Sequence, residues 1–375
     1  MKIKFQQFLA GKNHSWAIVA KSLARSFLSQ GHQVDLVSTD GPKDLFKQLQ
    51  EGKLPQYVPA DLASCFVEKP KDNYDLQISY TLPHNFHKYL SGTGKKFGIW
   101  CYEFPKIPPN LAKYHTAVDL ILPPSEFAKQ GFLNAGVPES KLKVVHHGID
   151  PWVPIDPYPL KNKKSFRFFF NLGQSHLRKN IKGTIEAYYK AFTKDDDVCL
   201  VAKISKPPQG IQAYESPNYV LPDKILQELN NQYSNHPVVE LITDYVPAIE
   251  SLYQACQVSY SLTHAEGFYM PGLEAMAAGK MVICPRYGGQ LDYCNDDNSL
   301  LVEGKVGRCP RAAQYWEDNA KNTWFEPDLD DAAIKLRLAH SQYQELQGKF
   351  QPGVKREVES HQWNQIALQI QSIVR

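Results

Sequence analysis

Strand-length apolar segments alternate with helical patterns along almost the whole chain. In the first half, the apolar segments lie at 2–10, 33–39, 74–81, 95–100, 119–124 and 141–148. An amphipathic helix is predicted over 15–29, and another in "SEFAKQGFLNAG", with Ser125 as N-cap and Gly136 just past the end. Strands that alternate with helices favour a mainly parallel sheet that is covered on both faces.

The same alternation starts again after a linker. The segment "GIDPWVPIDPYPLKNKKSF" carries four prolines and three lysines, and it cannot hold regular structure for long. Beyond it, strands are predicted at 166–173, 198–204, 238–243, 258–263 and 281–285, with a helix in "KGTIEAYYKAF". A chain of 375 residues is also too long for one ordinary core. We therefore predict two doubly wound, Rossmann-like α/β domains, 1–160 and 161–350, followed by a terminal helical segment, 351–375.

Composition excludes several classes of protein. Hydrophobic residues make up 43% of the chain and charged residues 22%, as expected for a globular rather than a disordered protein. The net charge of +3, from 42 basic and 39 acidic residues, is too balanced to indicate a nucleic-acid partner. There is no run of 18 apolar residues and no signal-peptide pattern, and the seven cysteines contain no CxxC pair. These features favour a reduced, cytoplasmic protein.

The stretch "HAEGFYMPGLEAMAAGK" (264–280) carries two carboxylates, Glu266 and Glu274, eight positions apart. It follows a predicted strand, and Pro271 suits the first turn of a helix that continues to Gly279. The first N–H groups of such a helix have no helical partner and form a site for a phosphate or diphosphate. Carboxylates on either side can accept hydrogen bonds from the hydroxyls of a sugar and a ribose. A nucleotide sugar fits this pattern; the plainer interpretation is that Glu266 caps the helix and Glu274 is solvated.

Ligands of doubly wound folds sit beyond the carboxyl ends of the strands. With two such domains facing a cleft, we expect the site to lie in that cleft.

Several segments resemble the retaining glycosyltransferases of family 4, which have the GT-B fold. "EGFYMPGLEAMAAGKMVIC" resembles the E-x7-E signature of that family, and departs from it at Tyr269, where Gly is usual, and at Met270. "ILPPSEFAKQGFLNAGVPESKLKVVHHGID" resembles the end of the family's first domain, and "NLGQSHLRKNIKGTIEAY" the start of its second. "GKNHSWAIVAKSLARSFLSQGHQVDLVST" resembles the first strand–loop–helix. The likeness runs from about residue 8 to 305 and implies GT-B architecture.

The resemblance implies roles for residues of the second domain. Lys179 would hold the donor diphosphate; the family's usual Arg after the strand-ending Gly173 is here Gln174, and Arg178 is the nearest further cation. Glu266 would contact hydroxyls of the transferred sugar, and Glu274 the ribose. The backbone N–H groups of Gly267, Phe268, Tyr269 and Met270 would contact sugar and phosphate, while the Tyr269 side chain would narrow the sugar pocket. Lys179 and Glu266 are the catalytic candidates.

Candidates for the acceptor lie in the first domain. Gly11 permits close backbone approach in "AGKNHSW", and Asn13 and His14 would project toward the phosphate or the acceptor, although Asn13 is equally a helix cap. In "GIWCYEFPKIPPNL", the aromatic rings of Trp100 and Tyr102 could stack on sugars and Glu103 could bind a hydroxyl, or all three could be wall residues. His84 is a further, weaker candidate.

The implied activity is the transfer of a sugar from a nucleotide-diphosphate sugar to a hydroxyl of a glycan, lipid or small-molecule acceptor, with retained configuration. Lys179 and the helix N-terminus would stabilise the leaving phosphate. The resemblance to GT-B enzymes also implies that neither a metal nor a cofactor is required. The D-x-D within 195–197 lies between a helix and a strand and is interpreted as a solvated turn. The alternatives are a catalytically silent GT-B protein that binds sugar nucleotides or serves as a scaffold, and another GT-B enzyme such as an epimerase or a phosphorylase.

Two expectations concern the surface and the terminus. Basic residues of the first domain could approach anionic lipid at the inner membrane face, or could be ordinary solvated residues: Lys2, Lys4, Lys12, Lys21, Arg25, Lys95 and Lys96. The tail "HQWNQIALQIQSIVR" is helical by pattern and, as in GT-B relatives, is expected to cross back to the first domain. Its broad apolar face comprises Trp363, Ile366, Leu368, Ile370 and Ile373.

Overall fold

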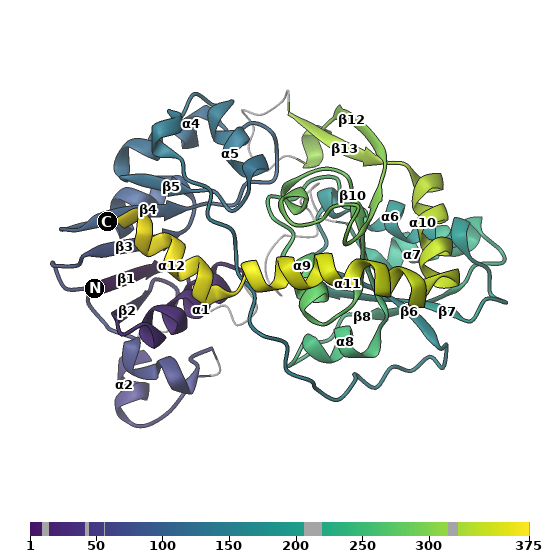
Figure 1. The fold of residues 1–375 in the computed structure, drawn as a ribbon, viewed down its shortest axis with the longest axis horizontal. Helices are drawn as coiled ribbons and strands as arrows, with labels where there is room; N and C mark the ends of the chain where they lie inside the picture. Colours follow the sequence, from purple (N-terminus) through teal and green to yellow (C-terminus); the bar gives the residue numbers. More distant parts are fainter. Residues whose placement is uncertain (10–14, 42–44, 56, 206–219, 314–321, 375) are drawn as a thin grey trace. The chain divides into compact units, whose positions relative to one another are not determined.

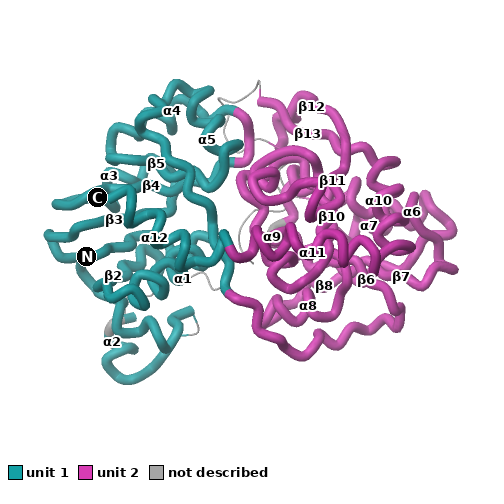
Figure 2. Tube along the Cα trace, in the orientation of Figure 1, with its two compact units in different colours: residues 1–102, 106–150, 360–375 teal, residues 103–105, 151–359 magenta. Residues whose placement is uncertain are grey.

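A computed structural model describes the chain except for residues 10–14, 42–44, 56, 206–219, 314–321 and 375. It divides into two compact units (Figure 2). Unit 1 comprises Met1–Tyr102, Lys106–Asp150 and Ser360–Arg375, and unit 2 comprises Glu103–Pro105 and Pro151–Glu359. The chain thus passes into unit 2 at 150/151, about ten residues before the expected boundary, and returns at 360 rather than 351.

Unit 1 is built on a five-stranded parallel sheet with the order β2-β1-β3-β4-β5 (Figure 1). Its strands are β1 (Lys2–Gln7), β2 (Gln33–Ser38), β3 (Leu76–Tyr80), β4 (Lys95–Ile99) and β5 (Leu120–Leu122). Its helices are α1 (Ser15–Ser29), α2 (Leu45–Gln50), α3 (Phe86–Tyr89), α4 (Pro109–Ala112), α5 (Glu126–Leu133) and α12 (Trp363–Val374). Every residue of the central strand β3 is buried, as expected for a strand that is covered on both faces.

In unit 1, one local prediction is confirmed at helix α5 and another is wrong in the segment after it. Ser125 caps α5 as predicted, because its side chain accepts a hydrogen bond from the Ala128 N–H, and Gly136 follows with φ of 85°. The predicted strand at 141–148 was wrong. Only Leu142 forms a bridge, to Ile121, before the chain leaves the sheet.

Two lysines expected on a lipid-facing surface are buried instead. Lys4 is 1% exposed and its Nζ donates to the Tyr89 carbonyl at 3.0 Å, while Lys21 Nζ donates to the Tyr57 carbonyl at 2.7 Å. Burial lowers the pKa of each lysine to about 8. Neither side chain can therefore contribute to a membrane-binding surface. No helix within the described ranges is long and apolar enough to span a bilayer.

Helix α12 packs against α1 within unit 1. It buries Trp363, Ile366, Ala367 and Ile370, whereas Leu368, expected on the same face, is 49% exposed. Gly148 allows the close approach of this helix, since a Cβ there would lie 2.5 Å from the Trp363 ring.

Unit 2 is built on a six-stranded parallel sheet with the order β11-β10-β9-β6-β7-β8, and a separate antiparallel pair, β12-β13 (Figure 1). The strands of the sheet are β6 (Phe166–Gln174), β7 (Val198–Ser205), β8 (Val238–Ile242), β9 (Val258–Tyr260), β10 (Met281–Pro285) and β11 (Leu300–Val302). The hairpin, which the sequence pattern missed, pairs β12 (Gly304–Arg308) with β13 (Thr323–Pro327). The helices are α6 (Ile181–Ala191), α7 (Pro222–Gln232), α8 (Glu250–Ala255), α9 (Met270–Ala277), α10 (Leu329–Ser341) and α11 (Tyr343–Ser360).

Alternate residues of β6 face opposite sides of this sheet. Phe168 and Phe170 belong to the core cluster that includes Tyr188 of α6, whereas the ring of Phe169 packs edge-on against Tyr253 of α8, with centroids 4.9 Å apart. Both faces of the sheet are therefore covered by helices. The prediction of two doubly wound α/β domains is confirmed in this respect.

Candidate functional site

The residues of the candidate site follow three neighbouring strands of unit 2. Strand β9 pairs in parallel with both β6 and β10, so the carboxyl ends of the three strands meet at one edge of the sheet. The segment after β6 carries Arg178 and Lys179, the segment after β9 carries Glu266, and the segment after β10 carries Gly288 and Gly289.

Lys179 and Glu266 form a direct ion pair, with 2.6 Å between Nζ and Oε1. Lys179 ends a short 3₁₀ helix, Leu177–Lys179, and Glu266 is 5% exposed. Burial opposes ionisation of Glu266, but the neighbouring Lys179 and Arg178 outweigh it and hold the pKa of the carboxyl below its usual value. The sequence had suggested both residues separately, and the structure brings them into contact.

Arg178 extends this pair into a chain of alternating charges. Its guanidinium lies 3.1 Å from Glu266 Oε2 and donates to Glu103 Oε1 at 2.8 Å and to the Ala265 carbonyl at 3.0 Å. Two cations thus face two carboxylates, and the cluster is neutral as a whole. Glu103, expected on the acceptor side, belongs to unit 2 and is held by Arg178.

Asn180 fixes the cationic segment against the segment that follows β9, a role the sequence analysis did not identify. It lies in the left-handed region with φ of 51° and caps α6, because its Oδ1 accepts from the Gly183 N–H at 3.1 Å. Its Nδ2 donates to the Leu262 carbonyl at 2.8 Å. A side chain at Gly183 would begin 2.5 Å from Asn180 Oδ1, so the Asn–x–x–Gly spacing was the available sequence signature.

Gly288 and Gly289 hold the Glu266 turn from the other side, and these two glycines were also missed. The Gly289 N–H donates to the Glu266 carbonyl at 2.8 Å. A Cβ on Gly289 would lie 2.1 Å from the Gly267 carbonyl oxygen, and Gly288 has φ of 96°. Adjacent glycines directly after a buried strand were the sequence signature of this close approach.

Helix α9 begins at Met270, with Pro271 in its first turn as predicted, and Gly279 follows it with φ of 67°. Its N-cap is Tyr269, which adopts the left-handed conformation, with φ of 67° and ψ of 59°. The helix thus begins four residues after Glu266.

The Tyr269 side chain is 5% exposed, and it was expected to narrow a sugar pocket. Instead it packs inward: a Cβ on Gly272 would lie 2.8 Å from the Tyr269 ring, and the Tyr293 hydroxyl donates to the Tyr269 carbonyl. Phe268 is likewise buried, with its ring 5.3 Å from that of Tyr293. These side chains pack inward and support the turn.

Glu274 lies one turn into α9 and is partly buried. Its Oε2 accepts a hydrogen bond of 2.8 Å from the hydroxyl of Tyr253, a residue of α8 that the sequence analysis did not single out. Burial raises the pKa of Glu274, while the bond from Tyr253 acts in the opposite direction. Glu274 is therefore not a solvated helix residue.

The other sequence candidates are either outside the described residues or packed elsewhere. Gly11, Asn13 and His14 lie outside the described residues, and so does the side chain of Gln174, although Gly173 has φ of 63°. Trp100 and Tyr102 are 3% and 2% exposed, and the centroids of their rings lie 5.0 Å apart. Neither ring therefore presents the open face for stacking on a sugar that the sequence analysis expected. His84 is half-buried, with its ring edge-on to Tyr114.

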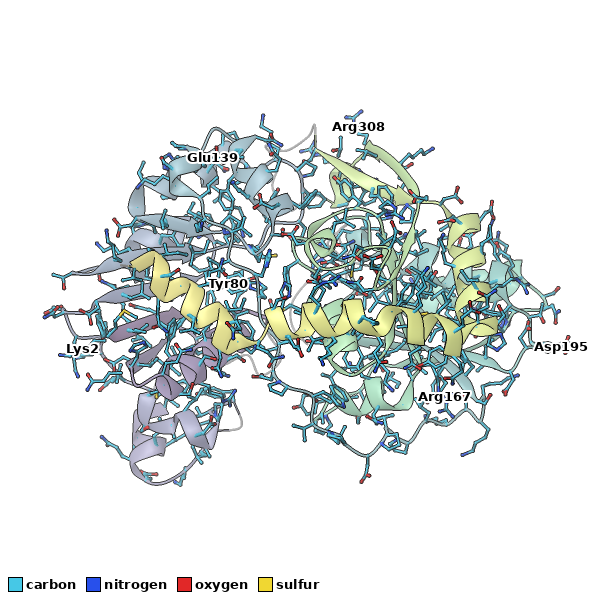
Figure 3. The ribbon with its side chains drawn as sticks, viewed as in Figure 1. Lys2, Tyr80, Glu139, Arg167, Asp195 and Arg308 are labelled. Carbon is cyan, nitrogen blue, oxygen red and sulfur yellow. The ribbon has the colours of Figure 1, made fainter. Side chains whose placement is uncertain are left out.

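The acidic run 195–197 lies at the amino end of β7, the opposite edge of the sheet from the site. Asp195 is exposed at the periphery of unit 2 (Figure 3), and Asp196 accepts from the Thr193 N–H at 2.7 Å, as in a solvated turn. Among the residues that the structure describes, no group of three or more His, Cys, Asp or Glu side chains could hold a metal ion.

Comparison with known proteins gives a family match over part of unit 2 and a shared fold with several solved structures. Residues 211–312 match the family model described as glycosyl transferases group 1. No curated protein matches the chain. Among solved structures, HepE of Anabaena in complex with UDP-glucose is 15% identical, with a TM-score of 0.70 and coverage of 100% of this chain and 99% of that one.

Two further solved structures share the fold. A glycosyltransferase from Rickettsia africae is 15% identical, with a TM-score of 0.65 over 99% of this chain and 97% of that one. The sucrose-phosphate synthase of Thermosynechococcus elongatus is 13% identical, with a TM-score of 0.67 over 99% and 98%. The predicted GT-B architecture is thereby confirmed at the level of the fold.

Proposed function

We propose that this protein is a glycosyltransferase that moves a sugar from a nucleoside-diphosphate sugar to a hydroxyl group. The observation that carries the proposal is the Lys179–Glu266 pair of 2.6 Å beside the N-terminus of α9, with Glu274 one turn along that helix. A cation, backbone N–H donors and two carboxylates are the groups that would bind a diphosphate flanked by two hydroxyl-bearing groups, which supports the proposal. The group 1 match over residues 211–312 supports the same class.

Lys179 and α9 would serve the leaving group. Negative charge develops on the diphosphate as the glycosidic bond breaks, and fixed donors in a partly buried site stabilise that charge. In the structure Glu266 holds the Lys179 ammonium, so a bound phosphate would share it with the carboxylate. Arg178, which is occupied by Glu103 and Glu266, would position Glu266 rather than replace the cation missing at Gln174.

The sugar and the ribose would be bound at either end of the diphosphate. Glu266 would accept hydrogen bonds from hydroxyls of the transferred sugar, and Glu274 from those of the ribose. UDP-glucose is the donor to try first, because HepE, which shares the fold, is solved with it. The acceptor would be a glycan, a lipid-linked sugar or a small molecule, and Asn13, His14 and His84 remain its candidate contacts.

The transfer would retain the anomeric configuration and need no metal ion. The acceptor hydroxyl would attack from the face on which the diphosphate departs, and a leaving phosphate oxygen would take its proton. Slow hydrolysis of the donor tests both points without a known acceptor. We expect UDP release to persist in EDTA and the freed sugar to appear first as the donor's own anomer by NMR; the opposite anomer would contradict retention.

The first test is nucleotide binding, measured by calorimetry with UDP, GDP, ADP and their glucose conjugates. We expect one nucleotide to bind, and Lys179→Ala to weaken it about 10- to 100-fold, as expected for a charge-assisted contact in a partly buried site. Lys182→Ala is the matched control, because Lys182 is nearby but exposed and paired with Glu228.

Each outcome of this experiment has a meaning. A folded protein that binds none of the nucleotides contradicts the proposal. Binding without any transfer or hydrolysis favours a silent GT-B protein that binds sugar nucleotides. Equal losses of nucleotide affinity in Lys179→Ala and Lys182→Ala would contradict the proposed contact between Lys179 and the phosphate.

A further inference from the structure

Glu274 has an unusual environment for a residue expected to meet a ribose. It is partly buried, and burial raises the pKa of its carboxyl, so the charged form is costly to maintain. The only hydrogen-bonding partner of the carboxylate within the described part of the chain is the Tyr253 hydroxyl, at 2.8 Å from Oε2. The second carboxylate oxygen, Oε1, has no such partner there. One carboxylate oxygen is therefore held by a hydrogen bond, and the other makes none with the described residues.

Tyr253 is fixed independently of Glu274. Its side chain is 1% exposed, and its ring meets that of Phe169 edge-on, at 4.9 Å and 88°. The hydroxyl also lies 3.1 Å from the Pro271 carbonyl, in the first turn of α9, and 3.3 Å from Asn171 Nδ2, which can donate to it. A tyrosine hydroxyl has one proton, so with Asn171 as donor that proton goes to Glu274 or to Pro271.

This arrangement joins three elements at one atom. The hydroxyl oxygen receives a hydrogen bond from β6 through Asn171, and gives one to α9 through Glu274 or Pro271, while the ring itself belongs to α8. A hydrogen bond to a carboxylate is stronger than one to a neutral carbonyl, and the distance to Glu274 is the shorter. The Tyr253 proton therefore belongs chiefly to the carboxylate and restricts its rotation.

We propose that Tyr253 is a positioning residue for nucleotide recognition: its hydroxyl holds Glu274 Oε2, so that Oε1 is presented to the ribose hydroxyls. The inference rests on the proposed function, since it takes Glu274 as the ribose-binding carboxylate. Tyr253 would affect ribose recognition through Glu274, without itself touching the ligand. Loss of the hydroxyl should weaken discrimination for the ribose 2′-hydroxyl rather than binding of the diphosphate.

The test compares UDP, GDP or ADP, whichever the wild-type protein binds, with its 2′-deoxy form. We expect the wild type to prefer the ribonucleotide about tenfold, the worth of one hydrogen bond to a charged group. Tyr253→Phe should lower this preference to about twofold or less and leave the affinity for the deoxy form nearly unchanged. Tyr188→Phe is the matched control, because the Tyr188 hydroxyl is also buried and bonded to a carbonyl, that of Val238, away from the site.

A double-mutant cycle with Glu274→Gln separates positioning from general destabilisation. If Tyr253 acts through Glu274, adding Tyr253→Phe to Glu274→Gln should not reduce the ribose preference further. Equal weakening of both nucleotides, or an unchanged preference in Tyr253→Phe, would overturn the inference while leaving nucleotide binding itself intact. A wild-type protein that binds no nucleotide would instead overturn the proposed function.

Discussion

At the scale of single residues, Arg178 is the residue of the candidate site whose removal we expect to destabilise unit 2 most. Its side chain is 10% exposed and its partners include two carboxylates and a backbone carbonyl. Removal would leave Glu103 without this cation and Glu266 with Lys179 alone. An uncompensated buried charge is costly, whereas an exposed pair contributes little.

We predict that Arg178→Ala lowers the free energy of unfolding of unit 2 by about 3–5 kcal/mol, measured by urea titration. Arg286→Ala is the matched control, because Arg286 also bonds two carboxylates, Asp296 and Glu303, but from a side chain that is 35% exposed. Its loss should cost about 1 kcal/mol or less. Similar costs for the two variants would show that the Arg178 network contributes no more than a surface pair.

Some residues of the candidate site could be predicted from local sequence patterns, and others could not. Glu266, Glu274 and Lys179 lie in segments with recognisable local patterns, so their neighbourhoods were predictable. Tyr253, Asn180 and Gly289 act on them through contacts between different strand ends, and such contacts depend on the order of strands in the sheet. Trp100 and Tyr102 are the opposite case, in which a local pattern led to a wrong expectation. An aromatic pair after a strand has the same sequence pattern whether it lines a site or packs inward.

At the scale of elements, the long apolar strands of both sheets were predictable because burial on both faces demands continuous apolar sequence. The β12-β13 hairpin was missed because β12, "GKVGR", is short and mostly exposed, and has no apolar alternation. The part of helix α11 before residue 351 was missed for a similar reason, since the helix is polar and contains Pro352. Elements with few buried side chains leave little trace in a hydrophobic pattern.

Helix α12 offers a direct test at this scale. Ile370 is fully buried on it, whereas Leu368, two residues earlier, is 49% exposed. We predict that Ile370→Ala destabilises unit 1 by about 2–5 kcal/mol, through lost burial and a cavity. Leu368→Ala should change stability by no more than about 0.5 kcal/mol.

Thermal and urea unfolding of the two variants would measure these changes. A comparable loss in both would mean that α12 is not packed through the face that the structure shows.

At the scale of the whole molecule, buried bases link stability to pH in both units. His147 in unit 1 is 3% exposed, and burial lowers its pKa to about 3; its Nε2 lies 3.1 Å from the Tyr80 hydroxyl. In unit 2, burial lowers the pKa of His176 to about 4. At each of these histidines the unfolded chain therefore binds more protons than the folded chain between about pH 6.5 and the lowered pKa, so each histidine contributes a loss of stability as the pH falls through that range.

For His147 the loss between pH 7 and pH 5 is about 2 kcal/mol, obtained from an unfolded pKa of 6.5 and a folded pKa of about 3. We predict that His147→Gln removes this part of the pH dependence in unit 1. Pulsed hydrogen exchange of β3 during urea unfolding would report unit 1 alone, and the exposed His87→Gln controls for loss of a histidine. Because Glu103 and Glu274 have raised pKa values and act in the opposite sense in unit 2, only the difference between variant and wild type isolates His147. An unchanged pH profile in His147→Gln would show that this histidine can accept a proton within the folded unit, against the burial that the structure gives it.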